Sequence, residues 1–509
     1  MRAAQRIWSA RGPKVLRALG TMPQVGASSS FLPGKVLPGA FKSPITKALW
    51  EIRSAEMEFQ EKRRAAGKRL PEKYLRPVPP SLSRSAIHYP FSIDTFLRED
   101  YRNPGGLVRI GRILEDLDAL AGNIAFKHCS EDPSFPLLVT ASVDRIVLRR
   151  HPELDCDITL MGRVVWTGRS SMVINMRCST SPPGMCYVGD EPWDDDAEQN
   201  FWLDANFTFV ARDRDTGRSR AVSPLDLGGD PLLDDEPADG SKGSPGQRGS
   251  EDGWRALWRR VNSHKTRQAL ERNAAKQASC PSSCLTSFFD GSASEEFLEL
   301  EAARRRREGE EARLVAAGFP LLHLPALANP HAVLMSQTAT SSTLICMPQH
   351  RNTANRIFGG FLMHRAYEVA FCAAFMFGGS RPRFSEIDEV VFLQPVDVGD
   401  LVKLDACILY TKEGREDGCP QACVEVLASV VRPEKIDSKV SNRFNLTFSF
   451  PEMAGGKTDQ SEGSSSNNGG TGPPQLLREV LPANSTEASR IVIAKHRDQM
   501  QDDVDGAPQ

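Results

Sequence analysis

Two short stretches of the chain combine residue types that could bind and activate a polar substrate. One begins with Gly359-Gly360, and paired glycines at a helix start let a ligand approach the backbone and expose N–H groups at the positive end of the helix dipole. The other carries Asp118, a carboxylate able to act as general base or nucleophile. The two stretches are far apart in the sequence, so a site that uses both depends on the fold.

The same two stretches are copies of one sequence unit. Residues 102–121 align without a gap on residues 351–370. Identical residues recur in register, namely Arg102 and Arg351, Asn103 and Asn352, and Gly111 and Gly360. The similarity continues downstream, where residues 206–209 (NFTF) match residues 445–448 (NLTF). An internal repeat of this kind predicts two copies of one fold.

Each copy predicts a loop that opens into a buried helix. In copy one the apolar residues follow the i, i+3, i+4, i+7 spacing of a helical face, at Ile110, Ile113, Leu114, Leu117, Leu120, Ala121 and Ile124. Asp118 lies at the shoulder of this stripe, and Tyr367 takes the equivalent place in copy two. Each helix is followed by β-branched and aromatic runs that predict strands. Copy two therefore keeps the glycine pair, and copy one keeps the acid.

Structural roles are also possible for these residues. Asp118 could be an exposed helix residue, because Glu115 and Asp116 lie beside it. Asn352 could simply form the turn before the helix. The glycine pair could serve close packing alone. His350 and His364 are left out of the catalytic set, the second because it is expected to project away from the apolar stripe.

Several segments resemble a known enzyme family. Residues 347–363 (MPQHRNTANRIFGGFLM), 394–400 (QPVDVGD) and 167–174 (TGRSSMVI) resemble the hotdog-fold acyl-CoA thioesterases. Residues 97–122, with the duplicated layout, are similar to the mitochondrial double-hotdog group, the acyl-coenzyme A thioesterase 9 type. The resemblance implies an α+β class of tandem hotdog folds, each an antiparallel β-sheet wrapped around a central helix, forming an intrachain pseudo-dimer. It also implies a homo-oligomer of such hotdog pairs.

In that family each site takes its loop from one copy and its helix carboxylate from the other. The resemblance therefore implies a catalytic set of Asp118, Asn352 and Gly360. The amide of Gly360 would polarise the thioester carbonyl, Asp118 would activate water or attack directly, and Asn352 would orient the water or the carboxylate. Gly359 would contact the substrate. Arg169 and Ser170 would contact CoA phosphates or shape the pantetheine tunnel, although Arg169 could equally cover a strand edge.

The second composite site would unite Asn103 with Tyr367. It lacks both the glycine pair and the acid, and Glu368 is rotated by about 100° from the required position. We therefore expect one live site and one degenerate site. Two alternatives to a thioesterase are a hotdog hydratase or dehydratase, which would need a histidine beside the carboxylate, and a non-catalytic acyl-CoA-binding protein.

The rest of the chain bounds the prediction. The length of 509 residues predicts more than one domain, and the net charge of −2 gives no electrostatic case for nucleic acid. The expected domains are hotdog 1 at residues 85–225 and hotdog 2 at 319–450. A linker with a polar helix is expected at 46–84, a flexible and helical linker at 226–318, and a disordered tail at 451–509. The charge-rich segment 295–315 is expected to be helical.

Residues 1–50 contain basic residues but no acidic ones, which is typical of an organelle transit peptide. We expect residues 1–45 to direct the protein to the mitochondrial matrix. No membrane span and no cofactor are expected. Two sets of possible metal ligands, Cys280 with Cys284 and the run 194–196 (DDD), are read as incidental thiols and a solvated charge run, so no metal is expected.

Overall fold

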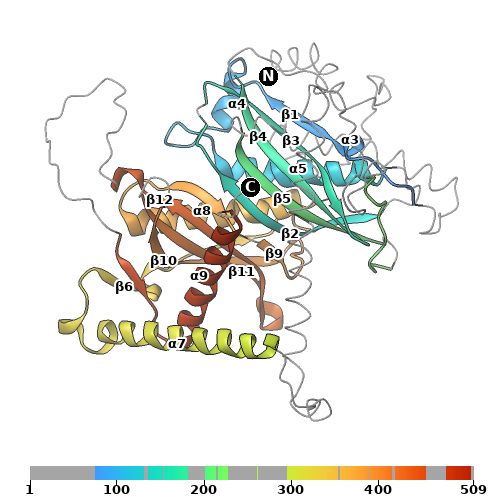
Figure 1. Cartoon of the computed structure of the whole chain (residues 1–509). Helices are drawn as coiled ribbons and strands as arrows, with labels where there is room; N and C mark the ends of the chain where they lie inside the picture. The colour runs from blue at the N-terminus through green and yellow to red at the C-terminus, as the bar shows by residue number, and fades with distance from the viewer. Residues whose placement is uncertain are drawn as a thin grey trace, which may run out of the picture. The chain divides into compact units, whose positions relative to one another are not determined.

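The computed structural model describes residues 75–130, 136–152, 154–181, 201–213, 216–226, 261, 295–352, 356–388, 390–414, 419–453 and 477–505 (Figure 1). The chain divides into two compact units. Unit 1 comprises residues 1–267, 345–365 and 389–400, and unit 2 comprises residues 268–344, 366–388 and 401–509. Unit 1 therefore contains two segments of the second sequence copy, including the start of its helix.

Unit 1 is an antiparallel sheet around one long helix. Its strands are β1 (Ser85–Tyr89), β2 (Leu137–Leu148), β3 (Asp157–Thr167), β4 (Ser171–Ser181) and β5 (Phe201–Arg212). Their order across the sheet is β1-β3-β4-β5-β2, and β9 (Val390–Phe392) pairs with β2. Short helices α3 (Pro80–Ser83) and α4 (Thr95–Asp100) and the 3-10 turn η7 (Pro348–His350) complete its described elements.

Helix α5 (Ile110–His128) is the central helix of unit 1 and contacts β2, β3, β4 and β5. Its apolar stripe is fully buried, with Ile113, Leu114 and Leu117 at 0% exposure. The predicted amphipathic helix is confirmed, but α5 is buried on almost every side, as expected for a helix enclosed by a sheet.

Unit 2 has the same design. Its sheet has the order β8-β12-β11-β10-β7, formed by β7 (Thr340–Ile345), β8 (Arg383–Ile387), β10 (Leu401–Glu413), β11 (Pro420–Arg432) and β12 (Asp437–Ser449). Helix α8 (Gly359–Gly378) belongs to unit 2 from Ala366 onward. There the ring of Phe371 packs against Phe448 of β12, with 6.2 Å between ring centroids. The α+β prediction of two helices, each with its own antiparallel sheet, is confirmed.

Unit 2 also has elements outside the repeat. Helix α7 (Glu295–His323) lies against α9 (Ser485–Asp505), as the yellow-green and dark red helices of Figure 1 show. The short strands β6 (Ala332–Leu334) and β13 (Glu479–Leu481) pair in parallel. The 3-10 turns are η5 (Pro325–Leu327), η6 (Met335–Thr338), η8 (Pro433–Lys435) and η9 (Pro451–Met453). The membrane-span criterion is met by none of the helices in the described ranges.

The loops that precede α5 and α8 confirm the sequence repeat at atomic level. The backbone N–H of Asn103 donates to the Leu107 carbonyl at 2.9 Å, and that of Asn352 donates to the Arg356 carbonyl at 2.5 Å. An isolated antiparallel bridge joins Arg102 to Val108 in copy one, and the equivalent bridge joins Arg351 to Ile357 in copy two. The Arg109 N–H donates to the Tyr101 carbonyl, and the Phe358 N–H donates to the His350 carbonyl at the equivalent position. The two loops therefore have one backbone design.

The expected disordered tail is wrong for residues 479–505, which contain β13 and the whole of α9. Polar residues dominate the tail, but α9 buries a small apolar face, with Ala488 and Ile491 at 0% exposure. The helix predicted at 295–315 is confirmed, and α7 continues to His323, beyond the expected start of hotdog 2. The transit segment, the linker of residues 227–260 and the metal candidates at 194–196, Cys280 and Cys284 lie outside the described residues.

Candidate active site

Asp118 is held by hydrogen bonds from two other segments of unit 1. It lies on α5 and is 2% exposed. Its Oδ2 accepts the backbone N–H of Gly360 at 2.7 Å, and its Oδ1 accepts the hydroxyl of Thr140 at 2.9 Å. The first bond joins the carboxylate of copy one to the glycine turn of copy two. Two donors on a buried carboxylate fix its orientation.

Both glycines at the start of α8 leave little room for a side chain, and Gly360 leaves less than Gly359. A Cβ on Gly359 would come within 3.1 Å of Asp118 Oδ2. A Cβ on Gly360 would be 2.9 Å from the Glu115 Cα and 2.8 Å from the Phe358 ring. The glycines therefore permit close packing of the α8 start against α5, and this packing aims the Gly360 N–H at Asp118. A role for that N–H in binding the substrate carbonyl stays a prediction.

Asn352 is half-buried in the loop before α8. Its Oδ1 accepts the backbone N–H of Arg356 at 3.1 Å. Asn103 makes the same kind of turn before α5, with Oδ1 accepting from Gly105 at 2.8 Å and from Leu107 at 3.0 Å. Turn formation is therefore a role of both asparagines. Orientation of water by Asn352 stays a prediction.

Thr140 is a site residue that the sequence analysis missed. It lies on β2 beside a register shift, where pairing with β5 slips between Thr140 and Ser142. Such a bulge redirects side chains locally. No motif marks this threonine in the sequence, because its partner Asp118 lies on a different element and is reached only through the fold.

The acidic neighbours of Asp118 are buried, so the interpretation of Asp118 as an exposed helix residue is wrong. Glu115 is 4% exposed and Asp116 is 0% exposed. Asp116 accepts hydrogen bonds from the hydroxyls of Tyr89, at 3.0 Å, and Tyr101. Burial, with the Asp116 charge beside it, raises the pKa of Tyr89 well above its ordinary value, so this phenol remains a donor.

The expectation that His364 projects away from the packed face is also wrong. His364 is 5% exposed, and its Nδ1 lies 3.2 Å from Glu115 Oε1. The prediction was wrong because an apolar stripe indicates only apolar contacts, whereas the face of α8 that carries His364 packs against the polar side chain of Glu115. His350 stacks on the Phe361 ring with 3.9 Å between centroids.

The remaining predicted residues lie in other surroundings. Tyr367 occupies the position of copy two that corresponds to Asp118, and within unit 2 its ring contacts Phe384 at a 5.5 Å centroid distance and Phe448 at 6.0 Å. Burial raises the pKa of this phenol. Arg169 is exposed in the β3–β4 turn, where its carbonyl accepts Val222 N–H at 3.0 Å. Ser170 Oγ accepts the Ser219 hydroxyl at 2.8 Å. The bonds of this turn thus run to the segment after β5.

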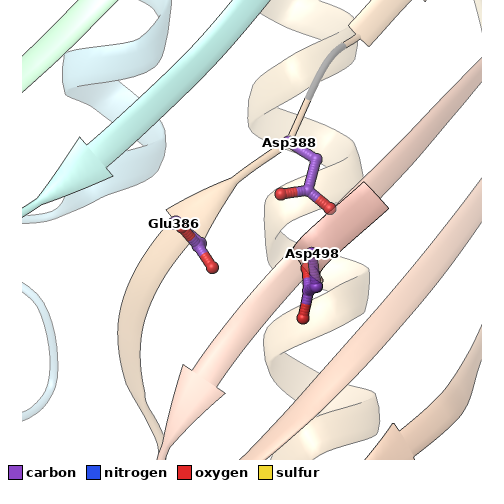
Figure 2. Close-up of side chains that lie close together, drawn as sticks. All are labelled: Glu386, Asp388 and Asp498. Carbon is purple, nitrogen blue, oxygen red and sulfur yellow. The ribbon is translucent and has the colours of Figure 1, made fainter. Parts of the chain in front are cut away.

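Unit 2 contains an acidic cluster of Glu386, Asp388 and Asp498, whose carboxylates converge in Figure 2. A cation from the protein already lies there, because Lys412 Nζ is 2.5 Å from Asp498 Oδ2 and 3.8 Å from Glu386 Oε1. The Tyr410 hydroxyl donates to Asp498 at 2.5 Å. The geometry is that of an ion-pair network that attaches α9 to the sheet of unit 2.

Comparison with known proteins places the chain in a family. No protein-family model matches the sequence. Acyl-coenzyme A thioesterase 2, chloroplastic, of Humulus lupulus is 39% identical, over 92% of each chain. Acyl-coenzyme A thioesterase 4, mitochondrial, of the same plant is 38% identical, over 93% of this chain and 76% of the relative. Acyl-coenzyme A thioesterase 9, mitochondrial, of Mus musculus is 30% identical, over 73% of each.

Among solved structures, an oleoyl thioesterase (putative) from Lactobacillus plantarum matches with a TM-score of 0.35 and 9% identity, over 72% of this chain and 95% of that one. The sequence relatives carry the assignment. The chain belongs to the acyl-coenzyme A thioesterases, which are thioester hydrolases. These relatives include plant and mammalian members named for mitochondria, and one named for the chloroplast.

Proposed function

We propose that the chain hydrolyses acyl-CoA to a free fatty acid and coenzyme A at one composite site, with Asp118, Asn352 and Gly360 as its catalytic residues. The observation that carries the proposal is the 2.7 Å bond from the Gly360 amide to the Asp118 carboxylate. This bond brings the acid of one copy to the helix start of the other. Family membership supplies the substrate class.

Hydrolysis at this site needs a base and a place for negative charge. Asp118 takes a proton from water as the water oxygen attacks the thioester carbonyl. The carbonyl oxygen becomes an oxyanion at the start of α8. There the Gly360 N–H shifts to it from Asp118, which is a weaker acceptor once protonated, and the positive end of the helix dipole stabilises the charge. Collapse of the intermediate breaks the C–S bond, and the sulfur of coenzyme A leaves with the proton held by Asp118.

Thr140 limits how Asp118 can move. Its hydroxyl donates to Oδ1 while the Gly360 amide donates to Oδ2, so the carboxylate plane is fixed from both sides. A fixed carboxylate suits proton transfer. Direct attack by Asp118 to form a mixed anhydride is the alternative. In a single turnover in ¹⁸O-labelled water, label in the Asp118 side chain would show that such an anhydride formed and was hydrolysed at the Asp118 carbonyl, which the general-base route cannot produce.

The proposal is tested by comparing substitutions in the proposed active site with substitutions in the degenerate site. In assays of thiol release from an acyl-CoA panel, we expect Asp118→Asn to lose most turnover, since it keeps the shape and removes the base. Asn352→Ala should lose much of it. The matched control is Asn103→Ala, which removes the same kind of turn contact from the other copy and should leave the rate within a few-fold. Glu368→Gln should behave like that control.

An inverted result would refute this assignment. Turnover that survives in Asp118→Asn and is lost in Glu368→Gln would mean that the other composite site does the chemistry. A parent protein that releases no thiol from any acyl-CoA tested would refute the function itself.

The assembly of the protein, its other substrate contacts and its destination in the cell are part of the same proposal. We infer that the protein assembles into a homo-oligomer and that Gly359, Arg169 and Ser170 contact the substrate. We also infer delivery to the mitochondrial matrix by residues 1–45. The acid-free basic composition of this segment and the organelle names of the relatives support that destination.

A further inference from the structure

The contact between Glu115 and His364 takes no part in the chemistry proposed above, yet it lies close to the proposed catalytic residues. Glu115 is on α5, one turn before Asp118, and His364 is on α8, one turn after Gly360. Their side chains are each 6% exposed and approach to 3.2 Å. Burying two polar groups costs desolvation free energy, and removing one of them leaves the other uncompensated, so this contact constrains how the two helices pack.

The two residues occupy equivalent positions in the repeat. The gapless alignment that sets Gly111 on Gly360 also sets Glu115 on His364. Their surroundings agree with this equivalence. A Cβ at Gly111 would lie 2.3 Å from the His364 ring, and a Cβ at Gly360 would lie 2.9 Å from the Cα of Glu115. Each residue of the pair thus packs on the glycine of the opposite helix.

These contacts fix how far α5 can slide along the start of α8. On α5, Gly111 contacts His364 of α8, and Asp118 contacts Gly360 of α8. Between them, Glu115 contacts both His364 and Gly360. The Glu115–His364 contact is the polar, directional member of this series. A slip at that contact displaces Asp118 from the Gly360 amide, because all three α5 residues lie on one rigid helix.

We propose that Glu115 and His364 are positioning residues that set the register between α5 and α8 and thereby hold Asp118 at the helix start of copy two. The proposal rests on the thioesterase function and deepens it. His364 Nδ1–H donates to the Glu115 carboxylate and neither side chain exchanges a proton with substrate. The pair affects the rate of the chemical step because it determines the position of Asp118.

The repeat provides a sharp test by exchange of the two residues. In the full chain, Glu115→Met and His364→Leu remove the acceptor and the donor, and each should lower kcat by about 10- to 100-fold, since a displacement near 1 Å at a catalytic group costs about 100-fold. KM should stay within a few-fold. The double variant Glu115→His with His364→Glu puts each side chain on the equivalent position of the other helix, and it should recover kcat to within about 10-fold of the parent.

A matched control is the pair His496 and Glu310, which joins α9 to α7 in unit 2 at 2.9 Å and is partly exposed. His496→Leu should leave kcat unchanged. The positioning role is overturned if either single variant keeps the parental kcat, or if the exchanged variant recovers no more activity than the singles although it melts like the parent. If the exchanged variant does not fold, Glu115→Met decides: a lowered kcat supports the positioning role, and a parental kcat overturns it.

Two further assays separate this inference from the proposed function. Parent protein and Asp118→Asn are measured beside the pair variants. A parent without thioesterase activity refutes the function. An active parent with an inactive Asp118→Asn and unchanged pair variants refutes only the positioning role.

Discussion

Replacing Gly360 with alanine tests whether the contact between α8 and Asp118 sets the rate. Gly360 lies in a helix and is not one of the glycines with positive φ, so alanine is allowed by the backbone. Its Cβ would lie 2.9 Å from the Glu115 Cα, and ordinary contact begins at 3.4 Å. Because this neighbour is backbone, the helices must separate by about 0.5 Å, the difference between the two distances.

The consequence can be worked out from that shift. A separation of about 0.5 Å along the contact would lengthen the bond from Gly360 N–H to Asp118 from 2.7 Å to about 3.2 Å, the outer limit of a good N–H···O bond. A misplacement of about 1 Å costs about 100-fold in rate, so half of it is expected to cost about 10-fold in kcat. Overpacking costs about 1–3 kcal/mol, and the higher helix propensity of alanine offsets about 1 kcal/mol of this.

The assay is steady-state hydrolysis of acyl-CoA, with thermal unfolding measured on the same samples. The matched control is Gly309→Ala on α7, where a new Cβ meets nothing within 4 Å. This change should leave kcat unchanged and stabilise the helix by up to about 1 kcal/mol. The reasoning is refuted if Gly360→Ala folds normally and retains the parental kcat, because the helix contact would then have no influence on Asp118.

Four other outcomes are expected. Thr140→Val, which keeps the shape and removes the donor to Asp118, should lower kcat with little change in KM, and an unchanged rate would remove Thr140 from the site. His128 is fully buried, and burial lowers its pKa below 6.5, so below this pH the unfolded chain binds a proton that the folded chain does not. The free energy of unfolding should therefore fall as the pH drops from 6.5, which urea titrations will measure. His128→Gln should flatten that dependence. Residues 1–50 fused to a reporter should send it to mitochondria, and a diffuse cytosolic signal would contradict the transit prediction. Limited proteolysis should cut first between residues 226 and 253, and resistance there would argue against a linker.

The repeat in the sequence was sufficient to predict the architecture. A 3.6-residue apolar period needs only neighbours along the chain, and it correctly indicated α5 and its buried face. The matching loops at Asn103 and Asn352 were predictable for the same reason, because their turns are closed by backbone bonds within a few residues. The helix α9 was missed, since its buried face is narrow and its sequence is mostly polar.

The sequence by itself determined that the chain has two copies of a helix with antiparallel strands, that the glycine pair survives in one copy, and that the acid survives in the other. Only the tertiary structure decided that Gly360 and Asp118 meet, that Thr140 joins them, and that His364 turns inward to Glu115. The physical reason is that local periodicity fixes which face of a helix is apolar. A hydrogen bond between distant segments depends on how those faces pack, and residues next to each other in the sequence do not indicate the distance between its donor and acceptor.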